Sequence, residues 1–202
     1  MAIMAAMAPL SWSGLKGTSH DFSTASWNAA SKQVCLPCHT PHNALSKLIP
    51  LWNHKTTTAT FTLYDSDTFA GKATISQPFG VSKACLSCHD GTVALNAYGA
   101  NAGQDVLTGL ANLGTDLRND HPICFVYDSA LVMQDVGLED PSVKTVKALN
   151  NRTIQDAMLI DNVMHCTTCH DVHASKGDAA TSASMVVVNN RGSALCLTCH
   201  KK

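Results

Sequence analysis

Four short segments of the chain carry the same arrangement of two cysteines and one histidine. Each segment reads Cys-x-x-Cys-His, and the segments span residues 35–39, 85–89, 166–170 and 196–200. The cysteines are Cys35, Cys38, Cys85, Cys88, Cys166, Cys169, Cys196 and Cys199, and the histidines are His39, His89, His170 and His200. Two thiols at this spacing can form thioethers to one haem, while the adjacent histidine ligates its iron as the proximal ligand. The pattern predicts four covalently bound haems c.

Zinc sites and disulfides are the main alternatives for repeated pairs of cysteines. A zinc ribbon closes a tetrahedral site with four thiolates, and a disulfide or dithiol centre needs only the thiols. None of these sites requires a histidine directly after every second cysteine, and all four pairs have one. The motifs therefore favour a multihaem cytochrome c. The ninth cysteine, Cys124, lies outside the motifs, and we expect it to be a buried thiol.

The second axial ligands must come from histidines outside the motifs. The chain has ten histidines, and the six that remain are His20, His42, His54, His121, His165 and His173. Four haems need at most four distal ligands, so every iron can have two histidines. A six-coordinate haem has no open position for a substrate and therefore transfers electrons without further chemistry. We expect an electron carrier and not an enzyme.

His42 and His173 are the strongest distal candidates because each follows a motif histidine by three positions. Neither imidazole can easily reach the iron that its neighbour binds, because axial ligands approach from opposite faces. Residues at this spacing on one short segment point towards different partners. Each segment is therefore expected to hold two haems close together.

The other four histidines differ in how well they are placed to act as distal ligands. His121 lies in the long interval between the second and third motifs, where a ligand would tie the segment down. His20 precedes the first motif, and it could fold back on its own chain or reach a haem of the next subunit. His54 is a reserve ligand, a propionate partner or an exposed side chain. His165 adjoins Cys166, which makes it a poor distal ligand for that haem.

Composition indicates that the haems themselves form much of the core. Aromatic residues make up 5% of the 202 residues and charged residues 14%, which is little material for an ordinary core. We expect one domain over residues 1–202, with residues 1–34 as an extended arm that could contact another subunit. Its fold should be loop-rich, with short α-helices and few short strands around a stacked chain of haems. A net charge of −1 gives no sign of a nucleic-acid surface.

Local patterns predict a few regular elements. Ser82 is a suitable N-cap for a helix through the second motif to Tyr98. A helix of three or more turns is expected to start at Asp140. Alternating apolar residues favour a strand within 56–64, and a valine run favours another over 185–188.

Covalent haem attachment takes place outside the cytoplasmic membrane, so an exported protein is expected, at the cell surface or in the extracellular space. Residues 1–10 are apolar but lack the basic region of a signal peptide. We interpret them as the start of a mature chain whose signal has been removed, or as a remnant of that signal. No apolar run approaches the length of a membrane-spanning helix, and no transmembrane segment is expected.

Several sequences outside the haem motifs add a family resemblance. The order His20-Asp21, Thr-Pro-His-Asn-Ala (40–44), Pro-Leu-Trp-Asn (50–53), Thr-Leu-Tyr (62–64), His121-Pro122 and Asp-Val-His (171–173) resembles the OmcE-type tetrahaem cytochromes. These extracellular cytochromes polymerise into filaments, or nanowires. The resemblance implies a head-to-tail homopolymer with a continuous stack of bis-histidine haems and one axial histidine supplied across the subunit joint. It also implies His20, His42, His121 and His173 as the distal ligands. His165 and residues 1–10 have no counterpart.

Two other functions are alternatives to that of a subunit in an extracellular filament. A monomeric periplasmic tetrahaem shuttle would dock on redox partners through a charged rim, and the low charge content disfavours it. A multihaem enzyme would need an open haem site, and the surplus of histidines argues against one. A filament would instead pass electrons to extracellular acceptors.

Overall fold

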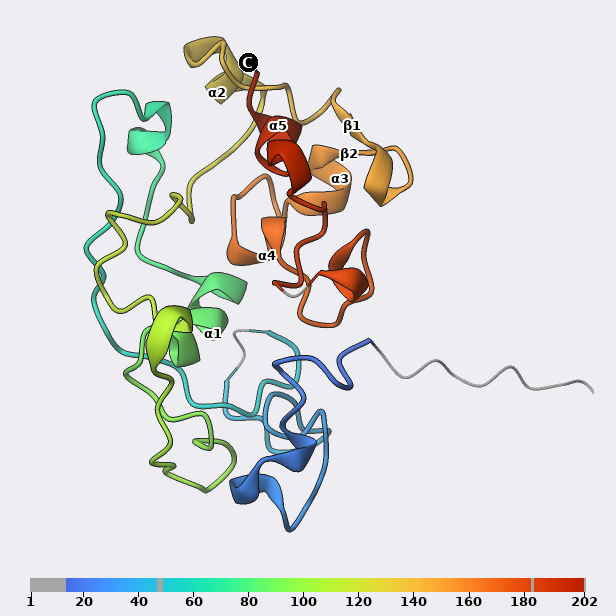
Figure 1. The fold of residues 1–202 in the computed structure, drawn as a ribbon. Helices are drawn as coiled ribbons and strands as arrows, with labels where there is room; N and C mark the ends of the chain where they lie inside the picture. The colour runs from blue at the N-terminus through green and yellow to red at the C-terminus, as the bar shows by residue number, and fades with distance from the viewer. Residues whose placement is uncertain (1–13, 47–48, 183, 202) are drawn as a thin grey trace, which may run out of the picture.

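The computed structural model describes residues 14–46, 49–182 and 184–201, and the interpretation of residues 1–10 lies outside these ranges. The described chain is rich in loops, with short helices and one small hairpin (Figure 1). The α-helices are α1 (Gly80–His89), α2 (Ser129–Gln134), α3 (Ile154–Met158), α4 (Cys166–Cys169) and α5 (Cys196–Cys199). Single 3₁₀ turns are η1 (Phe22–Thr24), η2 (Ser26–Asn28), η3 (Ala70–Ala73), η4 (Gly109–Ala111), η5 (Lys147–Leu149), η6 (Ala179–Thr181) and η7 (Arg191–Ser193).

Helix α1 is shorter than the sequence suggests and begins earlier. It starts at Gly80, so Ser82 lies within its first turn and does not cap it. The helix ends at His89, and Gly91 then takes a left-handed conformation with φ of 71°. Glycine adopts this conformation at little cost, and the chain turns away from the helix axis there. The expected continuation to Tyr98 therefore does not form.

A hairpin replaces the helix expected from Asp140. Strands β1 (Thr145–Val146) and β2 (Arg152–Thr153) pair antiparallel around a tight turn. Asn150 and Asn151 in this turn have φ values of 60° and 56°. Asparagine tolerates the left-handed region better than most residues, and two in succession stop a right-handed helix. Helix α3 begins directly after the hairpin, where the Thr153 hydroxyl accepts a hydrogen bond from the Asp156 N–H at 3.1 Å.

The two expected strands are single bridges. Within 56–64, Thr62 pairs with Asp116. In the valine run, Val186 pairs with His170 of the third motif. Both segments are extended, but in the described chain each pairs through one residue, so no longer β-ladder forms. The second bridge holds the end of one haem motif.

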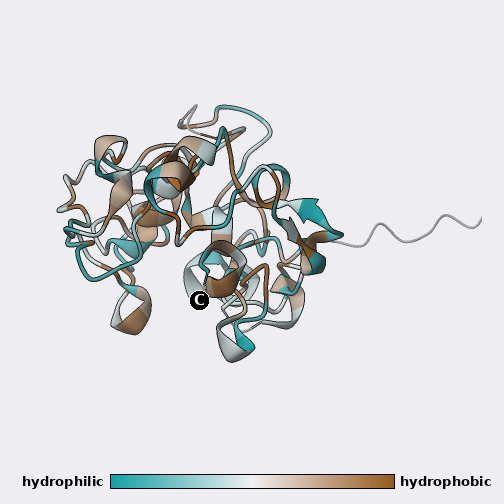
Figure 2. Ribbon diagram, turned by 90° about the horizontal axis from the view of Figure 1, so that it is seen from above, coloured by the Kyte–Doolittle hydropathy of each residue, from teal (hydrophilic) through white to brown (hydrophobic). Residues whose placement is uncertain are grey.

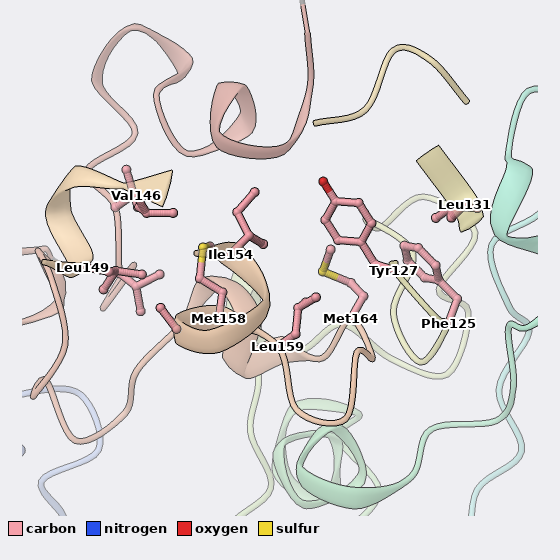
Figure 3. Packing of buried hydrophobic residues seen from close by; sticks show 12 residues of the cluster. Phe125, Tyr127, Leu131, Val146, Leu149, Ile154, Met158, Leu159 and Met164 are labelled. Atoms are coloured by element: carbon pink, nitrogen blue, oxygen red, sulfur yellow. The ribbon is translucent and has the colours of Figure 1, made fainter. Parts of the chain in front are cut away.

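Apolar side chains form two clusters and not one central core. Figure 2 shows hydrophobic residues spread along many segments of the fold. The larger cluster consists of Phe125, Tyr127, Leu131, Val146, Leu149, Ile154, Ala157, Met158, Leu159, Met164, Val187 and Val188 (Figure 3). The smaller one joins Phe61, Leu86 and Leu117. The larger cluster packs against Leu195 and Cys199, so it supports the fourth motif.

Candidate haem sites

Each Cys-x-x-Cys-His motif forms one tight turn of backbone. We number the motifs 1 to 4 in chain order: motif 2 lies on α1, motif 3 on α4 and motif 4 on α5. Motif 1 is a single turn, in which the His39 N–H donates to the Cys35 carbonyl at 2.7 Å. The corresponding bonds of His170 and His200 to the first cysteine of their motifs are 3.0 and 2.9 Å long. This turn brings both thiols and the imidazole of one motif together.

Backbone carbonyls orient three of the four motif imidazoles through Nδ1. The pairs are His39 with Pro50 at 3.0 Å, His89 with Ala111 at 2.8 Å and His170 with Ser184 at 2.8 Å. A histidine whose Nδ1–H is donated to a carbonyl presents Nε2 as its free metal ligand. The loops that supply these carbonyls therefore set the direction in which each proximal ring points.

Three of the four motif imidazoles stand opposite an imidazole from outside the motifs. The ring centres are 5.9 Å apart for His89 and His20, 6.3 Å for His39 and His173, and 6.4 Å for His200 and His121. Metal–imidazole bonds are about 2 Å long, so two rings on opposite sides of one metal have centres roughly 6 Å apart. The residues present fit a haem iron between each pair. Within the described ranges, His170 has no such ring partner.

Burial favours the neutral, ligating form of two of the distal imidazoles. Burial lowers the pKa of His20, and the nearby His89 and His170 lower it further. The Nδ1 atom of His20 is buried without a hydrogen-bond partner. Burial also lowers the pKa of His121, whose Nδ1 lies 2.9 Å from the Pro122 carbonyl. In both side chains burial thus favours the neutral imidazole, which is the form that binds iron.

Asp171 shapes the segment that carries His173. Its carboxylate accepts hydrogen bonds from the backbone N–H groups of His173 at 3.1 Å, Ser175 at 2.7 Å and Lys176 at 2.8 Å. The Ser175 hydroxyl adds a fourth bond at 2.9 Å. This turn carries His173 to His39 of motif 1, while His170 stays at its own motif. One short segment thus brings an imidazole to each of two motifs.

His42 does not face another described ring and is exposed. It lines an open hollow of about 600 Å³ together with Leu36, Leu45, Asn53 and Tyr98. The hollow lies beside motif 1, and His42 belongs to the segment that directly follows His39. An exposed imidazole next to an open hollow is accessible to a group of another molecule.

The two remaining histidines are buried. The ring nitrogens of His54 lie 2.7 Å from the Lys55 carbonyl and 2.9 Å from the Ala94 carbonyl. The Nδ1 atom of His165 lies 2.8 Å from the Ser82 hydroxyl. Both ring nitrogens of His54 thus face protein acceptors, whereas the His165 ring is held through Nδ1.

Thiols of consecutive motifs approach one another. The Cys85 thiol hydrogen-bonds to that of Cys166, which raises the pKa of Cys85 and lowers that of Cys166. Burial raises the pKa of Cys88 to about 12, and the neighbouring Cys38 contributes. Motif 1 thus lies beside motif 2, and motif 2 beside motif 3.

The fourth motif continues this order. Burial raises the pKa of Cys199 to about 12, and the neighbouring Cys169 of motif 3 contributes. Figure 1 shows α1, α4 and α5, which carry motifs 2 to 4, following one another across the molecule. The spatial order of the attachment sites is therefore their order in the chain.

Comparison with known proteins places the C-terminal pair of motifs in a family. Residues 161–202 match the family described as the doubled CXXCH motif. A search of the curated proteins finds no match to the chain. The family match indicates a multihaem c-type cytochrome with covalently bound haem, which takes part in electron transfer. None of the described helices has the length and apolar character needed to cross a bilayer.

Proposed function

We propose that this cytochrome conducts electrons through four bis-histidine haems as the repeating subunit of an extracellular filament. The observation that carries the proposal is the mismatch between His170 and His42. His170 is the motif histidine without a ring partner in the described chain, and His42 is an exposed histidine beside an open hollow. When two subunits meet, His42 of one subunit can serve as the second axial ligand of the haem that His170 of the other subunit binds.

The ligand assignment follows from the ring pairs. His173 is the distal ligand of the haem on motif 1, His20 of the haem on motif 2 and His121 of the haem on motif 4. The haem on motif 3 has His170 and receives His42 of a neighbouring subunit. The sequence left open whether His20 or His54 completes the fourth haem. The short distance of His20 from His89 supports ligation within one chain.

A continuous path for electrons is supported by the thiol contacts of motifs 1 to 4. Haem supplies one-electron chemistry, and its axial ligands set the potential. The protein holds consecutive attachment points near one another, and haems bound there would lie close together. A head-to-tail contact that does not close into a ring builds a filament, and an axial bond across that contact keeps the path short at the joint.

The test compares native extracellular fractions by electron microscopy and absorption spectroscopy. We expect filaments of low-spin haem from the wild type. His42→Ala should give dispersed subunits in which one haem has lost its second histidine. His20→Ala is the matched variant: it should keep the filament and open one haem inside each subunit.

Three outcomes contradict the proposal in different ways. Dispersed wild-type particles with four low-spin haems would support the soluble shuttle. Filaments of His42→Ala with all haems low-spin would remove His42 from the joint. Carbon monoxide binding to the reduced wild-type protein would show an open haem and support an enzyme.

A further inference from the structure

A group of buried polar atoms joins helix α1 to helix α4, where motifs 2 and 3 meet. The Ser82 hydroxyl lies 2.8 Å from His165 Nδ1 and accepts a hydrogen bond from the Cys166 N–H at 3.2 Å. Ser82 has no exposed surface, and His165 is 4% exposed. A hydroxyl has one proton and can accept two bonds, so Ser82 serves both partners at once.

Further contacts with neighbouring residues hold the ring of His165. Its centre lies 5.2 Å from that of Phe79, with the planes at 75°, an edge-to-face contact. The Cys124 sulfur lies 3.9 Å from His165 Nδ1 and is 1% exposed. The backbone N–H of His165 donates to the Thr168 hydroxyl at 2.9 Å, which anchors the first turn of α4. The imidazole is therefore immobilised between the two haem-bearing helices.

We propose that His165 and Ser82 are positioning residues that set the contact between the haems on motifs 2 and 3. The contact is direct, because Ser82 belongs to α1 and Cys166 is the first thiol of motif 3. Moving Cys166 relative to Ser82 moves its thioether bond and hence the edge of its haem. The inference rests on the proposed haem chain and adds a role for a histidine that ligates no iron.

The chemistry of the cluster distinguishes this role from simple filling of space. A buried polar group that loses its partner is costly, so Ser82 and His165 hold one geometry and disfavour alternatives. An apolar ring of similar size would keep the Phe79 contact but lose the bond to Ser82. An asparagine would lose the ring but keep a polar atom near the position of Nδ1.

The test uses the holoprotein with four variants: His165→Phe, His165→Asn, Ser82→Ala and, as the control, Ser26→Ala at an exposed serine. The readouts are the bisignate Soret circular dichroism, which reports on coupling between haems, and the reduction potentials of the haems. We expect His165→Phe and Ser82→Ala to lose part of the Soret couplet and to shift two of the potentials. His165→Asn and Ser26→Ala should retain both signals.

The outcomes separate this inference from the proposed function. Wild-type coupling that survives both His165→Phe and Ser82→Ala would overturn the positioning role while leaving the haem chain intact. Equal loss in His165→Asn and His165→Phe would show that a polar atom facing Ser82 does not preserve the haem contact and would also overturn it. If His165→Phe does not mature with four haems, Ser82→Ala decides. A wild type without any couplet would overturn the haem chain and the positioning role together.

Discussion

At the scale of single residues, the histidines differ in what their ring nitrogens face. Motif histidines His39, His89 and His170 donate Nδ1–H to backbone carbonyls and present Nε2. His54 has backbone carbonyls at both ring nitrogens, and His165 has the Ser82 hydroxyl at Nδ1. Counting histidines in the sequence gives the number of available ligands, but only the environment of each ring separates ligands from structural residues.

The first prediction concerns the distal ligand of the haem on motif 4. His121→Ala should leave this haem with one axial histidine, because His121 is the ring that faces His200 at 6.4 Å. One haem in four should become high-spin and bind carbon monoxide when reduced. Absorption and electron paramagnetic resonance spectra measure that fraction. His54→Ala is the comparison, and a matching carbon monoxide signal there would contradict the assignment.

Local chemistry explains which parts of the site could be predicted. Haem attachment depends on five consecutive residues, so the motif is readable from sequence alone. The pairing of His39 with His173 joins segments separated by two other motifs, and no local pattern encodes it. Asp171 had a weak signal: an aspartate directly follows both motif 2 and motif 3. Its role as acceptor of four hydrogen bonds depends on a turn that the sequence did not reveal.

At the scale of elements, the turn after motif 3 positions His173 opposite His39 of motif 1. Asp171→Asn should weaken this turn, because a neutral amide accepts hydrogen bonds less strongly than a carboxylate and its NH₂ group cannot accept them. We expect the free energy of unfolding to fall by about 1–3 kcal/mol, the range for hydrogen bonds to a charged group. Denaturant unfolding measures the loss, and the high-spin fraction shows whether His173 detaches.

The control for this change is Asp67→Asn, at an aspartate whose side chain is fully exposed. It should leave both the stability and the spin state unchanged. Equal effects at the two positions would show that net charge, and not the turn, determines the result.

The apolar cluster next to motif 4 supports a second prediction about elements. Ile154 begins α3 and has no exposed surface. Ile154→Ala should lower the free energy of unfolding by about 2–5 kcal/mol, because it leaves a cavity in packed surroundings. Val143→Ala, at a side chain that is 72% exposed, should change it by less than about 0.5 kcal/mol. Guanidinium unfolding followed by circular dichroism compares the two, and similar losses would contradict the packing shown in Figure 3.

Element boundaries were hard to predict from the sequence. The apolar spacing after Asp140 matches a helix, but Asn150 and Asn151 turn the chain into a hairpin. Ser82 has the right chemistry for an N-cap, and its hydroxyl bonds to another helix instead. In both cases a tertiary contact or a pair of turn residues outweighs a weak local preference.

At the scale of the whole molecule, the apolar core is distributed unequally. Between residues 14 and 60 of the described chain, the large buried apolar side chains are those of Leu15 and Trp52. The larger cluster lies between residues 125 and 188. The N-terminal part therefore depends most on haem for buried apolar surface, since ordering a chain requires enough burial to offset its entropy.

The last prediction follows from this imbalance. A chain expressed without haem attachment should lose most of its ordered structure, and residues 14–60 should be cleaved first in limited proteolysis. Fragments from residues 125–188 should persist longest. Mass spectrometry of timed digests, with the holoprotein as the control, measures the order. A haem-free chain as protected as the holoprotein would show that the polypeptide alone forms the core.

The pairing of His39 with His173 also has a consequence for biogenesis. A polypeptide that leaves the cytoplasm from its N-terminus delivers His20 before motif 2, so that haem has both ligands as soon as it is attached. Motif 1 emerges first, yet its partner follows motif 3. On the proposed ligand assignment, a haem attached to motif 1 during export from the N-terminus would keep one open axial position, accessible to oxidants and small ligands. On the proposed assignment this interval ends when His173 arrives, whereas the haem on motif 3 waits until a neighbouring subunit supplies His42.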